Sequence, residues 1–330
     1  MKPRTPIRIA GTGMYLPSGV RTNEHFISYL DTSDEWILSR TGIRERRYAA
    51  PDEATSTLAA NAARNALKDA NLSVADIDVI VCATATGDHQ FPSTASFVQG
   101  ALGAGNTPAF DISAACAGFL YGSIVASGLI GSGLYRRALV IGAEVLTRFA
   151  DPEDRGTCIL FGDAAGAAVL EASDDASRGI LYCDMGCDGT RADQIIVPAG
   201  GSRLPTTATT TAERLQFLRM KGREVYKFAV VKMQELIDQA LEATGLKPDD
   251  LKLVIPHQSN LRIIESVRER MGLPREKMVV NIDRYGNTSA ASVIMGLHEA
   301  RQNGALKSGD HVLMVAIGAG LAWGTIIVRM

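Results

Sequence analysis

The segment Asp76-Ile77-Asp78-Val79-Ile80-Val81 is matched 174 residues later by Asp250-Leu251-Lys252-Leu253-Val254-Ile255. Both segments end in short runs of β-branched and aliphatic residues, a composition typical of buried strands. A second pair of runs, Leu139-Val140-Ile141 and Leu313-Met314-Val315, has the same offset of 174. Because the pairs keep their order along the chain, we predict that it contains two similar halves.

A third match places two chemically useful residues at equivalent positions. Phe110-Asp111-Ile112, followed by Cys116, corresponds to Val280-Asn281-Ile282, followed by Asn287, at an offset near 170. A duplicated pair of strand–helix units creates a crevice between the halves, where ligands commonly bind. We therefore expect Cys116 and Asn287 to lie near one another across a pseudo-twofold axis.

A fourth match shows where the halves differ. Gly162-x3-Gly166 and Gly320-x3-Gly324 both precede strand-like runs, but their offset is only 158. The shorter offset predicts an insertion in the first half, around residues 146–159. We divide the chain into an N-terminal half, residues 1–175, and a C-terminal half, residues 176–330.

Helical patterns separate the strand-like runs, and this alternation favours an α/β fold. Ser56 precedes an Ala-rich stretch, Thr57–Ala70, with the spacing of a capped amphipathic helix. Phe217–Thr244 has the pattern of a second long helix. Ile112–Tyr135 carries no charge and is long enough to span a bilayer, but more than half of it is Gly, Ala or Ser. We expect a tightly packed central helix there and no membrane partner.

The composition excludes several classes of protein. Of the 330 residues, 46% are apolar and 21% are charged, unlike a disordered chain. The 34 Lys and Arg residues nearly balance the 36 Asp and Glu residues. The overall basic field of a nucleic-acid-binding protein is therefore absent, and we expect no nucleic-acid partner.

The cysteines and the N-terminal residues predict the cellular location of the protein. Five cysteines are scattered along the chain, which does not suit a disulfide framework. Residues 1–8 have no apolar stretch like that of a signal peptide. We therefore expect a cytoplasmic protein. Cys183-x3-Cys187 has no second ligand pair nearby, and no phosphate-binding glycine motif is present, so we expect no metal and no cofactor.

Three residues could perform chemistry together. Cys116 lies at a predicted strand-to-helix turn, where the helix dipole would stabilise a thiolate. His257 follows the strand-like run that ends at Ile255, and Asn287 lies at another strand-to-helix turn. Each has an ordinary structural alternative: a buried inert cysteine, a loop histidine and a turn-forming asparagine. The backbone of Gly318-Ala319-Gly320 could aim N–H groups at an oxyanion.

Seven motifs in order along the chain carry a family resemblance. They are Asp31-Thr32-Ser33-Asp34-Glu35-Trp36-Ile37, Thr41-Gly42-Ile43-Arg44-Glu45-Arg46, Ala114-Ala115-Cys116-Ala117-Gly118-Phe119, Asp151-Pro152-x-Asp154-Arg155-Gly156, Phe161-Gly162-Asp163, Pro256-His257-Gln258-x-Asn260-Leu261-Arg262-Ile263-Ile264 and Gly286-Asn287-Thr288-Ser289-Ala290-Ala291-Ser292. From about Ile7 to Met330, the chain resembles the beta-ketoacyl-[acyl-carrier-protein] synthase III family.

The resemblance implies a thiolase-like fold, with duplicated βαβα halves in five layers (αβαβα), and a homodimer. It implies an acyltransferase in which acyl-CoA, and specifically acetyl-CoA, acylates Cys116. His257 and Asn287 would then assist the decarboxylation of malonyl-[acyl-carrier-protein]. The main-chain N–H groups of Cys116 and Ala319 would form the oxyanion hole, although many relatives have Gly at the latter position.

The resemblance also implies binding positions. Those for CoA or the active-site network are Trp36, Arg40, Arg155, Gly222, Arg223 and Asn260. Arg223 departs from relatives that carry Asn there. Phe91 resembles a residue of the loop that lines the acyl pocket at the dimer interface. A basic patch for the carrier protein would comprise Lys227, Arg262, Arg268 and Arg270, for which a solvated helix face is the alternative.

Other functions share parts of this pattern. A secondary-metabolic ketosynthase with a different primer or acceptor has the same three residues. A papain-like hydrolase also uses Cys, His and Asn, but its local signature around the cysteine is absent. A non-catalytic binding scaffold would not need all three groups together.

Overall fold

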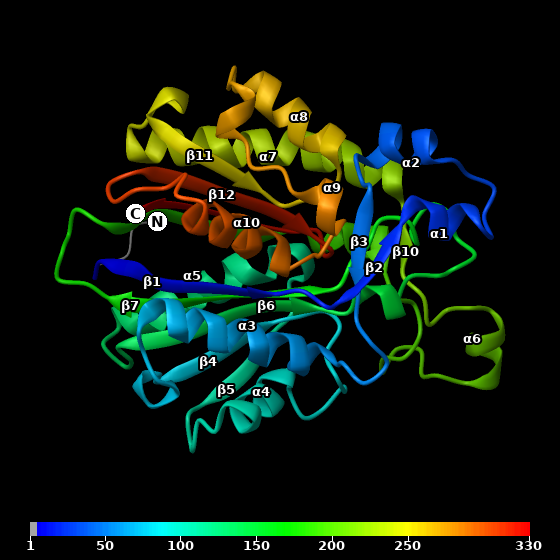
Figure 1. The fold of residues 1–330 in the computed structure, drawn as a ribbon, viewed down its shortest axis with the longest axis horizontal. Helices are drawn as coiled ribbons and strands as arrows, with labels where there is room; N and C mark the ends of the chain where they lie inside the picture. The colour runs from blue at the N-terminus through cyan, green and yellow to red at the C-terminus, as the bar shows by residue number, and fades with distance from the viewer. Residues whose placement is uncertain (1–4) are drawn as a thin grey trace.

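The computed structural model describes residues 5–330 (Figure 1). Residues 1–4, part of the segment from which we predicted that no signal peptide is present, lie outside the described residues. Among the described residues, no helix combines the length and apolar character needed to cross a bilayer.

One sheet is built mainly from the first half of the sequence. Its strand order is β1-β7-β6-β4-β5. The strands are β1 (Ile7–Tyr15), β7 (Ala164–Ala172), β6 (Arg137–Glu144), β4 (Val79–Ala83) and β5 (Ala109–Ile112). The three strands β6, β4 and β5 run parallel, whereas β7 is antiparallel to both of its neighbours.

The other sheet repeats this order. Its strands are β8 (Gly179–Cys187), β13 (Ala322–Arg329), β12 (His311–Gly318) and β11 (Leu251–Pro256). Here β11 and β12 are parallel, and β13 is antiparallel to both of its neighbours. A single parallel bridge from Val254 to Met278 occupies the place that β5 has in the first sheet. The duplication predicted from the repeat is therefore present, while a division between residues 175 and 176 stays a prediction.

The helices complete five layers (Figure 1). The central layer consists of α5 (Gly118–Gly131) and α10 (Ala291–Gln302), which contact strands of both sheets. The outer face of the first sheet is covered by α3 (Thr55–Ala70) with α4 (Thr94–Leu102), and that of the second by α7 (Gly222–Thr244) with α8 (Leu261–Arg270) beside it. Small residues allow the central packing: a Cβ on Gly122 of α5 would lie only 3.1 Å from Val140 Cγ1.

The remaining elements are short. They are β2 (Gly19–Thr22) paired with β3 (Glu45–Tyr48), β9 (Ile195–Ile196) paired with β10 (Arg219–Met220), and the helices α1 (Asn23–Ile27), α2 (Asp34–Thr41), α6 (Ala208–Ala212) and α9 (Ile282–Tyr285). The connection from β6 to β7 takes residues 145–163, but that from β12 to β13 takes only residues 319–321. The predicted insertion in the first half is confirmed.

Two predicted helix starts are wrong. Helix α3 begins at Thr55, so Ser56 is inside it, and both the backbone N–H and the hydroxyl of Ser56 donate to Asp88. Helix α7 begins at Gly222 instead of Phe217. The residues before it are drawn into tertiary contacts, since Arg219–Met220 pairs with β9 and Leu218 N donates to Phe149 O.

Candidate active site

Cys116 lies in the short turn of 3-10 helix, Ala115–Ala117, that joins β5 to α5. The end of β12 packs directly against this turn. A Cβ on Gly318 would lie 2.7 Å from both Cys116 N and Ala114 O, closer than real Cβ atoms approach. Gly318 therefore permits the contact that brings β12, and Ala319 after it, beside the main chain of Cys116.

A cavity of about 260 Å³ opens at this contact. Cys116, Asn287 and Ala319 all line it, so residues from both halves converge there. Most of the wall is apolar and comes from Leu146, Phe149, Phe161, Ile195, Ile196, Val197, Leu218 and Met220. The site can therefore hold an apolar group against a thiol and a carboxamide.

Asn287 is held in place by three hydrogen bonds. Its backbone N–H donates to Leu160 O (2.8 Å), and its carbonyl accepts from Gly162 N (3.1 Å). Its side-chain oxygen accepts from Ser289 N at 2.9 Å. Because the oxygen is engaged, the Nδ2 group is left as a hydrogen-bond donor for a ligand.

His257 follows the end of β11 and is almost completely buried. It is not among the residues that line the cavity of Cys116. Its backbone N–H donates to Val315 O (2.8 Å), and its Nδ1 lies 2.6 Å from Ser292 Oγ. Burial lowers the pKa of His257 to about 3, so the ring is neutral at pH 7. If Ser292 donates to Nδ1, the neutral ring carries its proton on Nε2 and can donate from there.

The Cys116 thiol is only partly exposed. Burial raises its pKa to about 12, which outweighs a lowering by a hydrogen bond from Ser289. The predicted thiolate, stabilised by the adjoining helix, is therefore not the resting form in this structure. The cause is desolvation, which disfavours the charged form more than the helix terminus favours it.

A buried acid lies behind the thiol. Glu144, the last residue of β6, accepts from Ser289 Oγ (3.0 Å) and Thr86 Oγ1 (2.5 Å). It also accepts from Thr84 Oγ1 and Ala85 N. Burial is the main cause that raises the pKa of this carboxyl group. Through Ser289, Glu144 is connected both to the thiol of Cys116 and to the turn that holds Asn287.

Sequence reasoning missed Glu144, and gave no role to Ser289 or Ser292. Glu144 had a signal: it is an acid that directly follows the apolar run Ala138–Ala143. A carboxylate at the end of a buried strand needs partners, and hydroxyl groups are suitable ones. For Ser289 and Ser292, there was no signal beyond their place in the motif that begins at Gly286.

Trp36, Arg40 and Arg155 lie together, as expected for one binding position. Trp36 and Arg40 are on α2, and Arg155 is in the long connection between β6 and β7. The Arg155 guanidinium lies 4.5 Å from the centre of the Trp36 ring, and that of Arg40 lies 6.0 Å away. Arg155 Nη1 also donates to Asp31 O.

The other predicted binding residues are more dispersed. Asn260 is the N-cap of α8: its side chain accepts from Arg262 N (2.9 Å) and donates to Arg40 O (2.9 Å). It therefore joins α8 to α2, and it is not among the described residues that line the cavity of Cys116. Gly222 and Arg223 are exposed in the first turn of α7.

Phe91 does not line the cavity of its own chain. It lies between β4 and α4, and its side chain is 84% exposed. A single exposed apolar side chain is common on protein surfaces and does not by itself assign a contact with another molecule. The prediction that Phe91 reaches an acyl pocket at a dimer interface stays a prediction.

The four residues of the predicted carrier-protein patch differ in how free their charges are to contact a partner. Lys227, Arg262 and Arg270 are exposed on α7 and α8. Arg262 lies over the ring of Tyr226, which joins the two helices. Arg268 instead donates to Glu265 (2.7 Å) and to Leu273 O (2.9 Å), so its charge is compensated within the chain. Within residues 5–330, no group of three or more His, Cys, Asp or Glu residues is arranged to hold a metal ion.

Two family models match the chain. The one described as 3-oxoacyl-[acyl-carrier-protein (ACP)] synthase III matches residues 110–189. The one described as 3-oxoacyl-[acyl-carrier-protein (ACP)] synthase III C terminal matches residues 241–330. The two matches cover the turn of Cys116, and the segments of His257, Asn287 and Ala319.

Curated proteins and a solved structure are similar over nearly the full length. Beta-ketoacyl-[acyl-carrier-protein] synthase III of Caldanaerobacter subterraneus subsp. tengcongensis is 50% identical over 97% of both chains. The protein of the same name from Symbiobacterium thermophilum is 50% identical over 98% of both. The crystal structure of 3-oxoacyl-[acyl-carrier-protein] synthase III from Aquifex aeolicus superposes with a TM-score of 0.90 at 46% identity, covering 98% of this chain and 100% of that one.

Proposed function

The chain belongs to the 3-oxoacyl-[acyl-carrier-protein] synthase III family, and from this we propose that Cys116, His257 and Asn287 are its catalytic residues. The protein is an acyltransferase with the thiolase-like fold, and it performs the initiating condensation of fatty-acid synthesis. The observation that best supports the assignment of Cys116 and Asn287 is the cavity that they share with Ala319, whereas the assignment of His257 rests on the family and its motif. No feature of the described residues favours a secondary-metabolic alternative.

The first half-reaction transfers an acyl group to Cys116. The sulfur attacks the thioester carbonyl of acyl-CoA, and the tetrahedral oxyanion accepts hydrogen bonds from the N–H groups of Cys116 and Ala319. The carbon–sulfur bond to CoA then breaks, and CoA leaves as the thiol with the proton that Cys116 loses. The apolar wall of the cavity suits the acyl chain, and we propose acetyl-CoA as the primer.

The second half-reaction forms the new carbon–carbon bond. Malonyl-[acyl-carrier-protein] presents its thioester carbonyl to two donors, Nε2–H of His257 and Nδ2–H of Asn287. These donors stabilise the enolate that forms when the carbon–carbon bond to the carboxylate breaks and carbon dioxide leaves. The enolate carbon attacks the carbonyl of acyl-Cys116, and the bond from that carbonyl to sulfur breaks. This releases 3-oxoacyl-[acyl-carrier-protein] and leaves a Cys116 thiolate, which takes up a proton from solvent.

Neither donor must give up its proton in this step, so a neutral ring and a carboxamide can share it. The lowered pKa of His257 agrees with this role, because a buried neutral ring needs no counter-charge. Its bond to Ser292 would fix the tautomer that donates.

The proposal extends to partners and location. Acyl-CoA would bind with its adenine and phosphates near Trp36, Arg40 and Arg155, since guanidinium groups pair with phosphate and an indole stacks on a base. The carrier protein would meet Lys227, Arg262 and Arg270. We further propose a cytoplasmic homodimer that needs no cofactor, with Phe91 at the interface.

The test is the mass of the intact protein after incubation with acetyl-CoA, followed by peptide mapping. We expect one acetyl group on Cys116, which disappears as acetoacetyl-carrier forms on addition of malonyl-[acyl-carrier-protein]. Cys187 is an exposed thiol and could react non-specifically, so a Cys187→Ala variant serves as the matched control. It should acetylate like the unmodified chain.

Different results have different meanings. No adduct on Cys116 from acetyl-CoA, but one from a longer or branched acyl-CoA, would overturn only the acetyl assignment. An adduct confined to Cys187, or none from any acyl-CoA, would overturn the assignment of Cys116 as nucleophile.

A further inference from the structure

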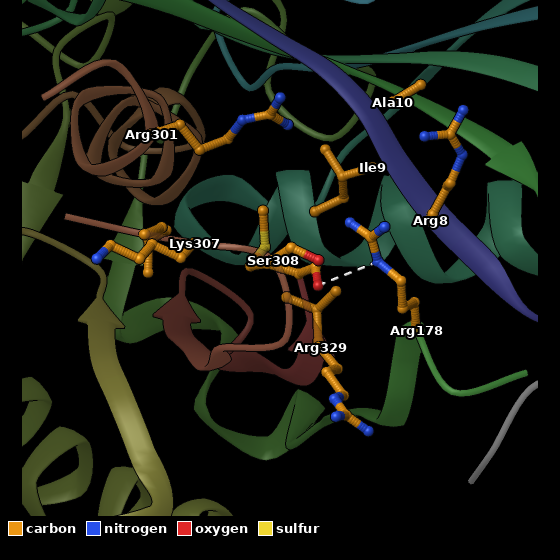
Figure 2. Close-up of a pocket in the computed structure, with 11 residues that line it drawn as sticks. Arg8, Ile9, Ala10, Arg178, Arg301, Lys307, Ser308 and Arg329 are labelled. Carbon is orange, nitrogen blue, oxygen red and sulfur yellow. Dashed lines mark hydrogen bonds between the residues drawn. The ribbon is translucent and has the colours of Figure 1, made fainter. Parts of the chain in front are cut away.

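A second pocket lies at the opposite end of the sheets from Cys116. It has a volume of about 300 Å³ and is lined by the start of β1, the residue before β8, the last turn of α10, residues 306–308 and the end of β13 (Figure 2). In the β12–β13 pair, Gly318 at the Cys116 end faces Ala322, whereas Arg329 at the pocket end faces His311. From His311 to Gly318 the strand rises over seven residue steps, roughly 24 Å.

Positive charge dominates this pocket. Its lining includes five cations and, among the described residues, no Asp or Glu. The cations are Arg8, Arg178, Arg301, Lys307 and Arg329. Two carboxylates form ion pairs with this group: Glu171 with Arg8, and Asp69 with Arg301. Glu171 is shared with a further cation, Arg137, so the carboxylates do not balance the positive charge.

Two other acids lie nearby but are used locally. Asp310 accepts from Lys307 N, and Asp175 accepts from the hydroxyl and N–H groups of Ser177. Within residues 5–330, neither forms an ion pair with a cation of the pocket. Hydrogen bonds from Ser177 and the charges of Arg178 and Arg329 lower the pKa of Asp175, so this carboxylate offsets part of the positive charge at the opening and the rest remains.

Arg301 provides the most specific observation. Its Nη2 lies 3.2 Å from Asp69 Oδ2, whereas its Nη1 is buried and has no hydrogen-bond partner among the described residues. A buried donor without a partner is costly, and more so on a charged group. The pKa of Arg301 is lowered by burial and by the charge of Arg8. An anion in the pocket would relieve both costs.

Arg178, the residue before β8, lines the same pocket as Arg301 of α10. Figure 2 shows the guanidinium groups of Arg301 and Arg178 extending toward the interior of the pocket, while the ends of Lys307 and Arg329 point outward at its rim. Arg178 Nε donates to the main-chain oxygen of Met330 at 3.2 Å, which fixes the group and leaves its Nη donors available. Met330 is the last residue of the sequence, so the acceptor belongs to its terminal carboxylate, which offsets part of the charge of Arg178.

We propose that this pocket binds a phosphate-bearing anion of the pyrophosphate class, held mainly by Arg301 and Arg178. A planar guanidinium donates two parallel hydrogen bonds to phosphate oxygens, which favours arginine over lysine for this ligand. Two guanidinium groups from different elements suit a ligand that offers oxygens on more than one side. The outward cations at the rim would attract a second phosphate group.

The site is independent of the acyl-transfer chemistry, but CoA also carries phosphates. The test therefore has to separate this pocket from the proposed CoA position. We would titrate the full chain with pyrophosphate in a calorimeter, and compare Arg178→Gln with Arg40→Gln. Each variant removes one positive charge, the first from this pocket and the second from the other end of the molecule.

We expect saturable binding of one pyrophosphate per chain, about tenfold or more weaker in Arg178→Gln and unchanged in Arg40→Gln. Arg301→Gln should have at least as large an effect, but it also leaves Asp69 without its cation. Among the described residues, Arg178 forms no ion pair with an Asp or Glu side chain, so Arg178→Gln is the primary variant, and its thermal unfolding should match that of the unmodified chain.

Absence of saturable binding would overturn the proposal. So would weakening in Arg40→Gln with none in Arg178→Gln, since the probe would then occupy the CoA position. Parallel titrations identify the source of the phosphate: ADP that binds more tightly than pyrophosphate, and that is weakened by Arg178→Gln but not by Arg40→Gln, would indicate a nucleotide in this pocket, and equal binding a simple polyphosphate. Acetate that binds as tightly as pyrophosphate would overturn the phosphate class.

Discussion

The two turns that precede the central helices α5 and α10 carry different chemical groups. The first joins strand β5 to α5, whereas the second joins the short helix α9 to α10, so the strand-to-helix turn predicted at Asn287 is wrong. The first turn, Ala115–Ala117, carries a thiol that is partly open to the cavity. The second carries Asn287, whose main chain and side-chain oxygen are held by Leu160, Gly162 and Ser289. Duplication thus explains why the two residues meet, and on their residue types we propose that Cys116 reacts and Asn287 positions a substrate.

The connections that follow β6 and β12 also differ, both in length and in what they contribute to the site. The long one, residues 145–163, contributes apolar wall and Arg155, whereas the short one, residues 319–321, contributes a main-chain N–H group beside Cys116. The first half therefore supplies the proposed nucleophile and the proposed contacts of Trp36, Arg40 and Arg155 with CoA, whereas both halves contribute apolar wall. The second half supplies most of the proposed donors to developing charge.

Cys116→Ala should distinguish the proposed roles of the two turns most clearly. We expect acyl transfer to fall by about 10⁴-fold or more, because no other group replaces the nucleophile. Decarboxylation of malonyl-[acyl-carrier-protein] should remain within a few-fold, since its donors lie on the second half. Carbon dioxide release and 3-oxoacyl product are measured separately, and an equal loss of both would contradict the division of roles.

The state of the thiol can be tested by alkylation. With the pKa of Cys116 raised to about 12, the thiolate fraction grows tenfold per pH unit across the accessible range. The rate of reaction with iodoacetamide at Cys116 should therefore rise about 100-fold from pH 7 to pH 9. The measurement uses a Cys187→Ala background and peptide mass. A rate that levels off near pH 7 would instead support a thiolate stabilised by the helix.

Asn287→Ala gives the opposite pattern to Cys116→Ala. Loss of one donor to a developing oxyanion costs about 10²-fold or more, so decarboxylation should fall by that factor. Acetylation of Cys116 should change by only a few-fold. Asn287→Asp is a useful companion, because it keeps the acceptor to Ser289 N but removes the Nδ2 donor. If Asn287→Asp retains full decarboxylation, Asn287 is structural.

The sequence allowed the architecture to be predicted because the repeat reports strand order directly. The matched runs at residues 76–81 and 250–255 became β4 and β11, at corresponding places in the two sheets. Local sequence patterns were less informative where tertiary contacts determine the start of a helix or the pairing of short strands. The start of α7 and the short β9–β10 pair depend on contacts with the cavity wall and with Phe149, which no local periodicity encodes.

The same contrast holds within the site. Cys116 and Asn287 could be paired from the repeat, and the cavity contains both. The resting state of the thiol could not be predicted, because desolvation depends on all surrounding segments at once. Glu144 lies one residue beyond a predicted strand, yet its importance is visible only when Ser289, 145 residues away, is beside it.

Glu144→Gln tests how the two turns are coupled. The charge of Glu144 raises the pKa of Cys116, so its removal should speed alkylation at pH 8 by several-fold. Condensation should nevertheless fall by about tenfold, because the amide nitrogen of Gln cannot accept from all the donors that now face Glu144. These opposite signs distinguish a positioning residue from one that only supports folding, which would slow condensation without speeding alkylation. Glu144→Asp should restore part of the condensation rate.

Trp36→Ala should have the smallest effect, and that effect should be confined to the KM for acyl-CoA. Loss of an aromatic stacking partner is worth about 0.5–1.5 kcal/mol, which corresponds to a rise of about two- to twelvefold in KM for acyl-CoA. The value of kcat and the KM for malonyl-[acyl-carrier-protein] should not change, because the second half supplies those interactions. Trp36 also packs against the core, so Trp36→Phe, which retains a ring, is the control for packing. If both substrates lost affinity equally, recognition of CoA would not belong to the first half alone, and the comparison between the halves would hold only for the chemistry.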